Sequence, residues 1–112
     1  MSYTETYTIL LHEDNSSKDH KWLKTYFKLE NGAVCLYIHD FVGDEEIEHW
    51  YKLSFKDSAI FMTKGQIDYK DSKQAEIDLK KLLVKDAENI ILRFEELCKE
   101  WGLEINFMAW RS

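Results

Sequence analysis

The stretch DFVGDEEIE at positions 40–48 concentrates five carboxylates and contains no basic side chain. A pair of carboxylates can perform acid–base catalysis when burial raises the pKa of one member. Acidic residues in consecutive positions beside Gly43 are more typical of exposed groups that are all ionised, and the stretch lacks the alternating oxygen ligands and central glycine of a calcium loop. We therefore interpret it either as a solvated hairpin loop or as an anionic surface for a basic protein partner. The carboxylates are Asp40, Asp44, Glu45, Glu46 and Glu48.

A second candidate site combines Cys35, His39 and Asp40 as nucleophile, base and orienting group. Four residues of an extended strand span about 13 Å, so Cys35 and His39 cannot hydrogen-bond to each other. A thiol enzyme would need a base from another segment, such as His49. A cysteine packed on a sheet is the simpler interpretation, and we predict no catalytic residue.

Imidazole and carboxylate side chains also gather between residues 12 and 20, where together they could bind zinc. Their spacing matches no established ligand pattern and no cysteine lies nearby, so we predict neither a metal nor a cofactor. A solvated loop explains the segment equally well. The side chains concerned are His12, Glu13, Asp14, Asp19 and His20.

Charge and composition restrict the classes of partner. The 112 residues include 15 Lys and Arg against 21 Asp and Glu, a formal net charge of −6, which disfavours direct binding to nucleic acid or to anionic lipid. The longest apolar run is AVCLYI, and the chain does not open on a basic segment followed by an apolar one. We therefore expect a cytoplasmic protein with no membrane span and no export signal. Cys35 and Cys98 fall in apolar surroundings and are expected to be buried, reduced thiols.

The elements that position these residues begin with a predicted strand at 3–12, where apolar and polar residues alternate. The polar segment 13–20 predicts a loop. Beyond it, Asn31-Gly32 separates two β-rich runs and favours a two-residue type I′ turn, which fixes the register of the hairpin. The predicted pairs on its apolar face are Leu29 with Val34, Phe27 with Leu36 and Thr25 with Ile38.

The opposite face of this hairpin is amphipathic rather than merely polar. Trp22, Tyr26 and Tyr37 lie on it among basic residues, and large side chains with a polar tip favour a contact surface. The same pattern suits a platform for single-stranded nucleic acid, which the net negative charge disfavours. A second covering layer, from the terminal strand or from a homodimer, is the alternative. The predicted pairs are Lys28 with Cys35, Tyr26 with Tyr37, Lys24 with His39 and Trp22 with Phe41.

A further hairpin is predicted between residues 49 and 64, because apolar and polar residues alternate there around a turn at Asp57-Ser58. Its predicted pairs are Phe55 with Ile60 and Leu53 with Met62. From Asp71 the apolar period becomes helical and continues to Trp101, after which Gly102 serves as a helix C′ residue. Asp71 and Gln74 resemble a capping box. One helix of this length would span about 46 Å, so a kink or a restart capped by Asp86 is the alternative.

Residues 103–110 alternate again and predict a final strand that returns to the sheet. The chain is thus predicted to be one α+β domain over residues 1–112. In this fold an antiparallel β-meander of about five or six strands is packed on one face by the long helix of the C-terminal half.

Small size, acidic charge, many aromatic residues and no catalytic signature together favour a stoichiometric protein inhibitor over an enzyme. We expect it to occlude a basic active site or nucleic-acid channel of a toxin or nuclease, as an immunity protein or a phage-encoded anti-defence protein would. The carboxylates of 44–48 would take the place of phosphates, and nearby aromatic residues would anchor the contact. The alternatives are a small-molecule or peptide-binding module on the aromatic face and, third, a small hydrolase or metal enzyme.

Overall fold

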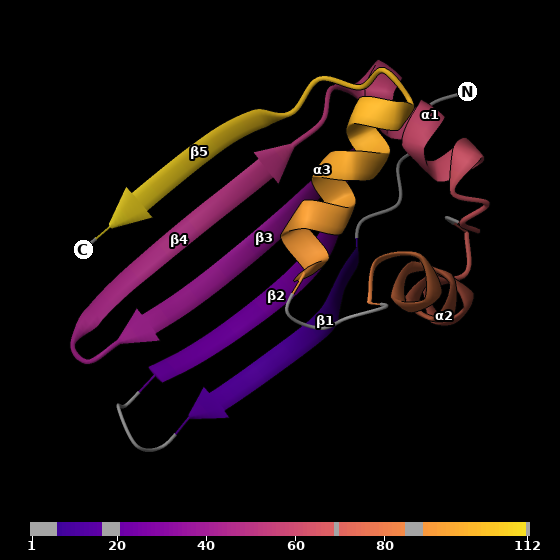
Figure 1. The fold of residues 1–112 in the computed structure, drawn as a ribbon. Helices are drawn as coiled ribbons and strands as arrows, with labels where there is room; N and C mark the ends of the chain where they lie inside the picture. The colour runs from indigo at the N-terminus through magenta and orange to yellow at the C-terminus, as the bar shows by residue number, and fades with distance from the viewer. Residues whose placement is uncertain (1–6, 17–20, 69, 85–88, 112) are drawn as a thin grey trace.

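The computed structural model describes residues 7–16, 21–68, 70–84 and 89–111 (Figure 1). These residues form a five-stranded antiparallel sheet in sequence order and three helices, which confirms the predicted α+β class. The strands are β1 (Tyr7–Ser16), β2 (Lys21–Glu30), β3 (Ala33–Val42), β4 (Glu45–Lys52) and β5 (Asn106–Arg111). The helices are α1 (Phe55–Lys64), α2 (Ser72–Leu83) and α3 (Ile90–Glu100). Within the described ranges, no helix has the length and apolar character needed to cross a membrane.

The turn between β2 and β3 is formed by Asn31 and Gly32 as predicted, with φ angles of 51° and 83°. Both residue types tolerate a positive φ, which this turn requires so that its twist matches that of the strands. Every predicted pair of this hairpin is present, from Leu29 opposite Val34 to Trp22 opposite Phe41. The turn therefore decides which side chains of β2 and β3 share a face.

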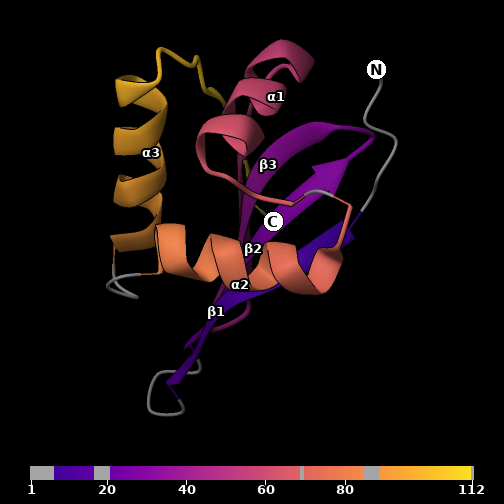
Figure 2. The ribbon, with the colours of Figure 1, turned by 90° about the vertical axis from the view of Figure 1, so that its right-hand side faces the viewer.

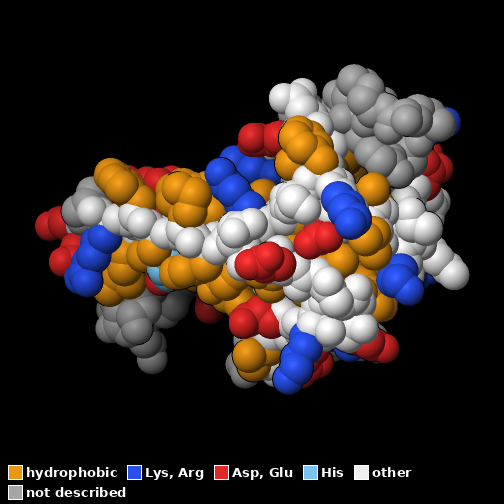
Figure 3. All heavy atoms as spheres, turned by 90° about the horizontal axis from the view of Figure 1, so that it is seen from above, with side chains coloured by type: hydrophobic (Ala, Val, Ile, Leu, Met, Phe, Trp, Pro, Cys, Tyr) orange, Lys and Arg blue, Asp and Glu red, His pale blue; other side chains and the backbone are white. Residues whose placement is uncertain are grey.

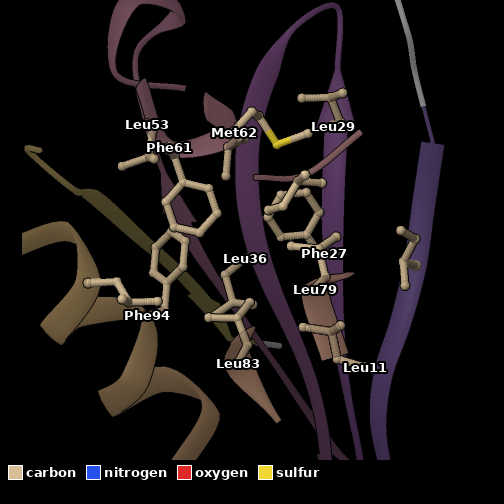
Figure 4. Packing of buried hydrophobic residues seen from close by; sticks show 14 of the residues in the cluster. Leu11, Phe27, Leu29, Leu36, Leu53, Phe61, Met62, Leu79, Leu83 and Phe94 are labelled. Atoms are coloured by element: carbon tan, nitrogen blue, oxygen red, sulfur yellow. The ribbon is translucent and has the colours of Figure 1, made fainter. Parts of the chain in front are cut away.

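The helices pack against one face of the sheet, over the end where β3 begins, and together they enclose the core (Figures 1 and 2). Phe61 of α1 lies between two other rings, with centroid distances of 6.1 Å to Phe27 of β2 and 5.3 Å to Phe94 of α3. Leu79 and Leu83 of α2 are buried in the same cluster (Figure 4). The turn between β3 and β4 lies at the opposite end of the sheet, away from the helices (Figure 1).

The second predicted hairpin is wrong, because α1 replaces its turn and its return strand. Ser54 caps this helix: its hydroxyl oxygen accepts a hydrogen bond from the backbone N–H of Asp57 at 3.1 Å. Phe61 and Met62 are buried whereas Phe55 is 65% exposed, a pattern that follows the helical rather than the strand period. Neither predicted pair, Phe55 with Ile60 nor Leu53 with Met62, is formed.

The strand before α1 begins earlier than the sequence suggested. β4 pairs with β3 from Val42 opposite Glu45 to Cys35 opposite Lys52, and Gly43, with a φ of 64°, lies in the tight turn between them. The loop interpretation of the acidic stretch is therefore wrong for four of its five carboxylates, which are strand residues: Asp40, Glu45, Glu46 and Glu48.

The long helix predicted from Asp71 is divided into α2 and α3. Asp71 caps α2, since its carboxylate accepts hydrogen bonds from the backbone N–H groups of Lys73 and Gln74. The predicted capping box is present only in this half, because the Gln74 side chain donates to Asp78. The N-cap of α3 is Asn89, and the predicted restart residue Asp86 lies outside the described residues. Figure 2 shows α2 and α3 running at a steep angle to each other, so that both apolar stripes face one core. A continuous helix could not place both stripes over the same part of the sheet.

The outer strands differ from the prediction mainly in extent. β1 continues to Ser16, so the predicted loop is wrong for residues 13–16. Residues 3–6 and 17–20 lie outside the described ranges. The register of β1 shifts between Leu10 and His12, and the extra residue Leu11 is buried in the core. β5 follows the last helix as predicted and pairs with β4, and all of its residues are exposed.

Candidate functional site

The side chains that the sequence singled out lie mainly on the sheet face opposite the helices, which we call the open face. Successive residues of a strand point to opposite faces, and Leu36 and Ile38 of β3 point into the helix-covered core. Cys35, Tyr37 and His39 therefore project to the open face. Of the helices that the structure describes, none lies over it (Figures 1 and 2).

A continuous line of large side chains crosses the open face from β1 to β5. We call it the aromatic row, and it consists of Leu10, Tyr26, Tyr37, Trp50 and Met108, each paired with the next in register. Ring centroids are 5.8 Å apart between Tyr26 and Tyr37 and 5.5 Å apart between Tyr37 and Trp50. The Lys28 ammonium lies 4.4 Å from the Tyr37 ring centre, a cation–π contact. Tyr37 is consequently buried by its neighbours although none of the described helices covers it.

Exposure along the aromatic row is lowest at Tyr37, in the centre of the sheet, and highest at β5. Met108 and Trp110 are 53% and 47% exposed, and Trp110 pairs with Glu48 on β4. Figure 3 looks onto the β5 edge and shows hydrophobic side chains on both sides of it. Large apolar side chains of this kind, grouped on one surface, mark contact sites more often than they mark ordinary solvated surface.

One part of the acidic stretch joins the open face next to the aromatic row. Glu48 lies directly opposite His39, and Glu46 lies two residues before it on the same face of β4. The Tyr37 hydroxyl donates a hydrogen bond to a carboxylate oxygen of Glu48, and the His39 Nε2 contacts a carboxylate oxygen of Glu46. We call His39, Glu46 and Glu48 the imidazole–carboxylate cluster; all three are half-buried.

The remaining carboxylates of the stretch lie elsewhere. Asp40 and Glu45 point to the helix side of the sheet, beyond the area that the helices cover, and Glu45 forms an exposed ion pair with Arg111 of β5. Asp44 is in the exposed turn. The five carboxylates predicted as one anionic surface are thus distributed over two faces and a turn, all at the end of the sheet farthest from the helices.

The predicted aromatic residues are brought together in part. Tyr26 and Tyr37 stack in the aromatic row. Trp22 is paired with Phe41 through its backbone, but its side chain lies outside what the structure describes.

The electrostatics of the open face favour packing and hydrogen bonding over thiol chemistry. Burial raises the pKa of the Cys35 thiol, although the nearby charges of Lys52 and Lys28 lower it, and a raised pKa keeps the weakly nucleophilic thiol form. Burial, followed by the hydrogen bond and charge of Glu48, raises the pKa of Tyr37. The Tyr37 hydroxyl therefore remains a hydrogen-bond donor at neutral pH. Cys35 and Cys98 are both buried, free thiols.

Of the possible zinc ligands in residues 12–20, those that belong to β1 lie on opposite faces of the sheet. Glu13 projects to the open face, where it lies 3.8 Å from the Lys24 ammonium. His12 and Asp14 are paired with Thr25 and Leu23 and so point to the other face. Asp19 and His20 lie outside the described residues.

Sequence reasoning missed Trp50, Met108 and Trp110 as members of the open face. The available signal was the alternation in EEIEHWYK at 45–52, which resembles that of a strand with one polar face. Which face each residue joins depends on the pairing of β4 with β3 and β5, and no local turn signal fixes the pairing with β5.

Comparisons of the chain with protein-family models, with curated proteins and with solved structures give no match. The functional assignment therefore depends on the geometry of the open face.

Proposed function

We propose that this protein binds and inhibits a partner protein through the open face of its sheet. The observation that carries the proposal is the aromatic row, continued by Trp110, on a face that no described helix covers. Tyr, Trp and Met are the residue types enriched at the centres of protein interfaces, because each offers a large contact area with few rotatable bonds or an adaptable shape.

The distribution of charge along the strands indicates which partner the open face would accept. Carboxylates lie at the end with the β3–β4 turn, where Glu46 and Glu48 are on the open face and Asp44 is in the turn. Lys28 and Lys52 lie at the other end of the open face, opposite the helices across the sheet. Lys24 lies nearer the carboxylates, where it pairs with Glu13. A basic surface on the partner would meet the carboxylate end, and the net charge of −6 would accelerate the encounter.

The inhibitory mechanism that follows is occlusion. The turn end projects away from the helices (Figure 1), so it can enter a concave basic site such as the active site of a toxin or a nucleic-acid channel. There the carboxylates would take the positions of phosphates. The rim of the partner's site would pack against the large side chains of Trp50, Met108 and Trp110.

The experiment that tests this proposal starts from capture on the tagged protein in lysate of the native host, at low and at high salt. The captured protein is then purified. The stoichiometry of its complex, expected to be one to one, its inhibition and its rate of association are measured in excess chelator, so that no metal ion contributes. Replacing Asp44, Glu45, Glu46 and Glu48 with Ser should slow association and reduce its dependence on salt. If the quadruple variant associates as fast as the wild type at every salt concentration, the carboxylate end does not meet the partner.

A further inference from the structure

We propose that His39, Glu46 and Glu48 bind one divalent first-row transition-metal ion, of which Zn²⁺ is the representative. The ligand atoms of these three side chains, one imidazole nitrogen and one oxygen from each carboxylate, all lie within 4.8 Å of one another. The site shares Glu46 and Glu48 with the protein contact proposed above, but it does not depend on that contact, because it would bind metal in the isolated chain.

Strand geometry explains why the three side chains converge. Glu46 and Glu48 are two residues apart on β4 and so project from the same face. His39 lies directly opposite Glu48 across the β3–β4 ladder, and it also reaches diagonally to Glu46, which its Nε2 contacts. Directly opposed and diagonal pairs are the closest neighbours that a sheet offers. The short turn at Gly43 holds this register.

The donor set selects the class of metal. One imidazole and two carboxylates suit Zn²⁺ and its neighbours among the first-row divalent ions, whereas Ca²⁺ prefers a larger set of oxygen ligands and Mg²⁺ retains most of its water. In a tetrahedral zinc site, ligand atoms lie about 3.4 Å apart, which follows from metal–ligand bonds of about 2.1 Å. The cluster can reach that spacing through small side-chain rotations.

The surroundings support a metal in two further ways. The side chains of His39 and Glu46 are 19% and 33% exposed, which leaves the ion accessible while limiting competition from water. The Tyr37 hydroxyl donates to Glu48, and such outer-shell hydrogen bonds orient carboxylate ligands in metal sites. Tyr37 is therefore a positioning residue, since it acts through Glu48.

Three protein ligands leave at least one coordination position of the ion open. In the isolated chain that position would be occupied by water. A donor side chain from a bound protein could replace the water, in which case the metal would bridge the two proteins.

Titration of chelator-treated protein with Zn²⁺, followed by calorimetry, tests the site without any partner. We expect one Zn²⁺ per chain and a loss of affinity of at least about tenfold in Glu46→Gln and in His39→Gln. The matched control is Glu45→Gln, which removes a neighbouring charge on the other face of β4 and should change the affinity by less than about twofold.

Co²⁺ provides a spectroscopic check, because the intensity and position of its visible absorption bands report the coordination number and ligand field of the bound ion. These bands should differ between Glu46→Gln, which retains the imidazole ligand, and His39→Gln, which lacks it. Glu46→Gln and His39→Gln are measured separately, so that the failure of one to fold leaves the other as the test. Equal Zn²⁺ affinity in the wild type and in the folded variants would overturn the proposal, as would an equal loss in Glu45→Gln. The proposed protein contact of the open face would not be affected by that result, because it is tested in excess chelator.

Discussion

The hydroxyl of Tyr37 on β3 donates a hydrogen bond to the carboxylate of Glu48 on β4, and this bond joins the aromatic row to the imidazole–carboxylate cluster. Tyr37 also lies between Tyr26, on which its ring stacks, and Trp50, whose ring is tilted against it. One side chain thus fixes both the apolar and the acidic parts of the open face, and changes to either part are expected to affect the other.

Removing only the hydroxyl, as in Tyr37→Phe, should lower the free energy of unfolding by about 1 kcal/mol, because the bond to a carboxylate is lost at a half-buried site. Chemical denaturation monitored by circular dichroism measures the change. The matched control is Tyr26→Phe, which removes the hydroxyl from the ring stacked on Tyr37. That hydroxyl makes no hydrogen bond with the described residues. An equal effect in both variants would show that the bond to Glu48 contributes nothing.

The replacement of the predicted hairpin by α1 gives two phenylalanines opposite roles. Phe61 is fully buried whereas Phe55 is 65% exposed. We expect Phe61→Ala to lower the free energy of unfolding by about 3–5 kcal/mol and Phe55→Ala to change it by less than about 0.5 kcal/mol. Urea denaturation of the two variants checks this, and a large loss in Phe55→Ala would argue for the strand instead of the helix.

A buried hydroxyl connects α1 to the start of β3. The backbone N–H of Val34 donates to the Ser58 Oγ at 2.8 Å, and Ser58 is fully buried. Ser58→Ala should therefore lower the free energy of unfolding by about 1–3 kcal/mol, because the Val34 N–H loses its partner away from water. Ser72→Ala, at the exposed start of α2, serves as the comparison and should have little effect. Equal stabilities for the two variants would contradict this role for Ser58.

The Cys98 thiol makes stability depend on pH in the alkaline range. Burial, with smaller effects from Asp57 and Glu95, raises its pKa from 9.0 to about 12. Above pH 9 the unfolded chain ionises Cys98 and the folded chain does not, so the free energy of unfolding falls as the pH rises from 9 toward 12. Thermal unfolding at several pH values should show that Cys98→Ala loses less stability over this range than the wild type. Parallel curves for the two proteins would be inconsistent with the raised pKa.

The central hairpin could be predicted from the sequence because its information is local. Asn31-Gly32 selects the turn, the turn selects the register, and the register assigns Tyr26 and Tyr37 to one face. The N-cap Asp71 and the glycine at position 102, which has a φ of 70°, mark helix boundaries by similarly local chemistry.

The errors arose where a short apolar run fits two periods. The segment around Leu53 and Phe55 alternates like a strand, yet Ser54 supplies a helix N-cap and tertiary packing buries Phe61. No proline or glycine in the sequence marks the division between α2 and α3. The apolar stripe also continues in phase across it. It follows instead from the limited area of the sheet that the helices must cover.

The candidate site was predictable only in part for a related reason. Glu46 and Glu48 could be recognised as anionic. Their contact with His39 and Tyr37 requires the β3–β4 register, which could not be predicted while the segment was interpreted as a loop. The contribution of Trp110 requires the pairing of β5 with β4, which joins residues far apart in the sequence.

The measurement that tests the central claim most directly compares partner binding by Trp110→Ser and Leu92→Ser. Trp110 is 47% exposed on the open face, and Leu92 is 57% exposed on α3 in the helix layer, so both variants replace an exposed apolar residue with Ser. If the open face is the contact, Trp110→Ser should weaken binding roughly 30-fold, as loss of an interface hot spot of about 2 kcal/mol does, whereas Leu92→Ser should bind like the wild type. Wild-type affinity in Trp110→Ser together with a loss in Leu92→Ser would contradict the account and would move the contact to the helix layer.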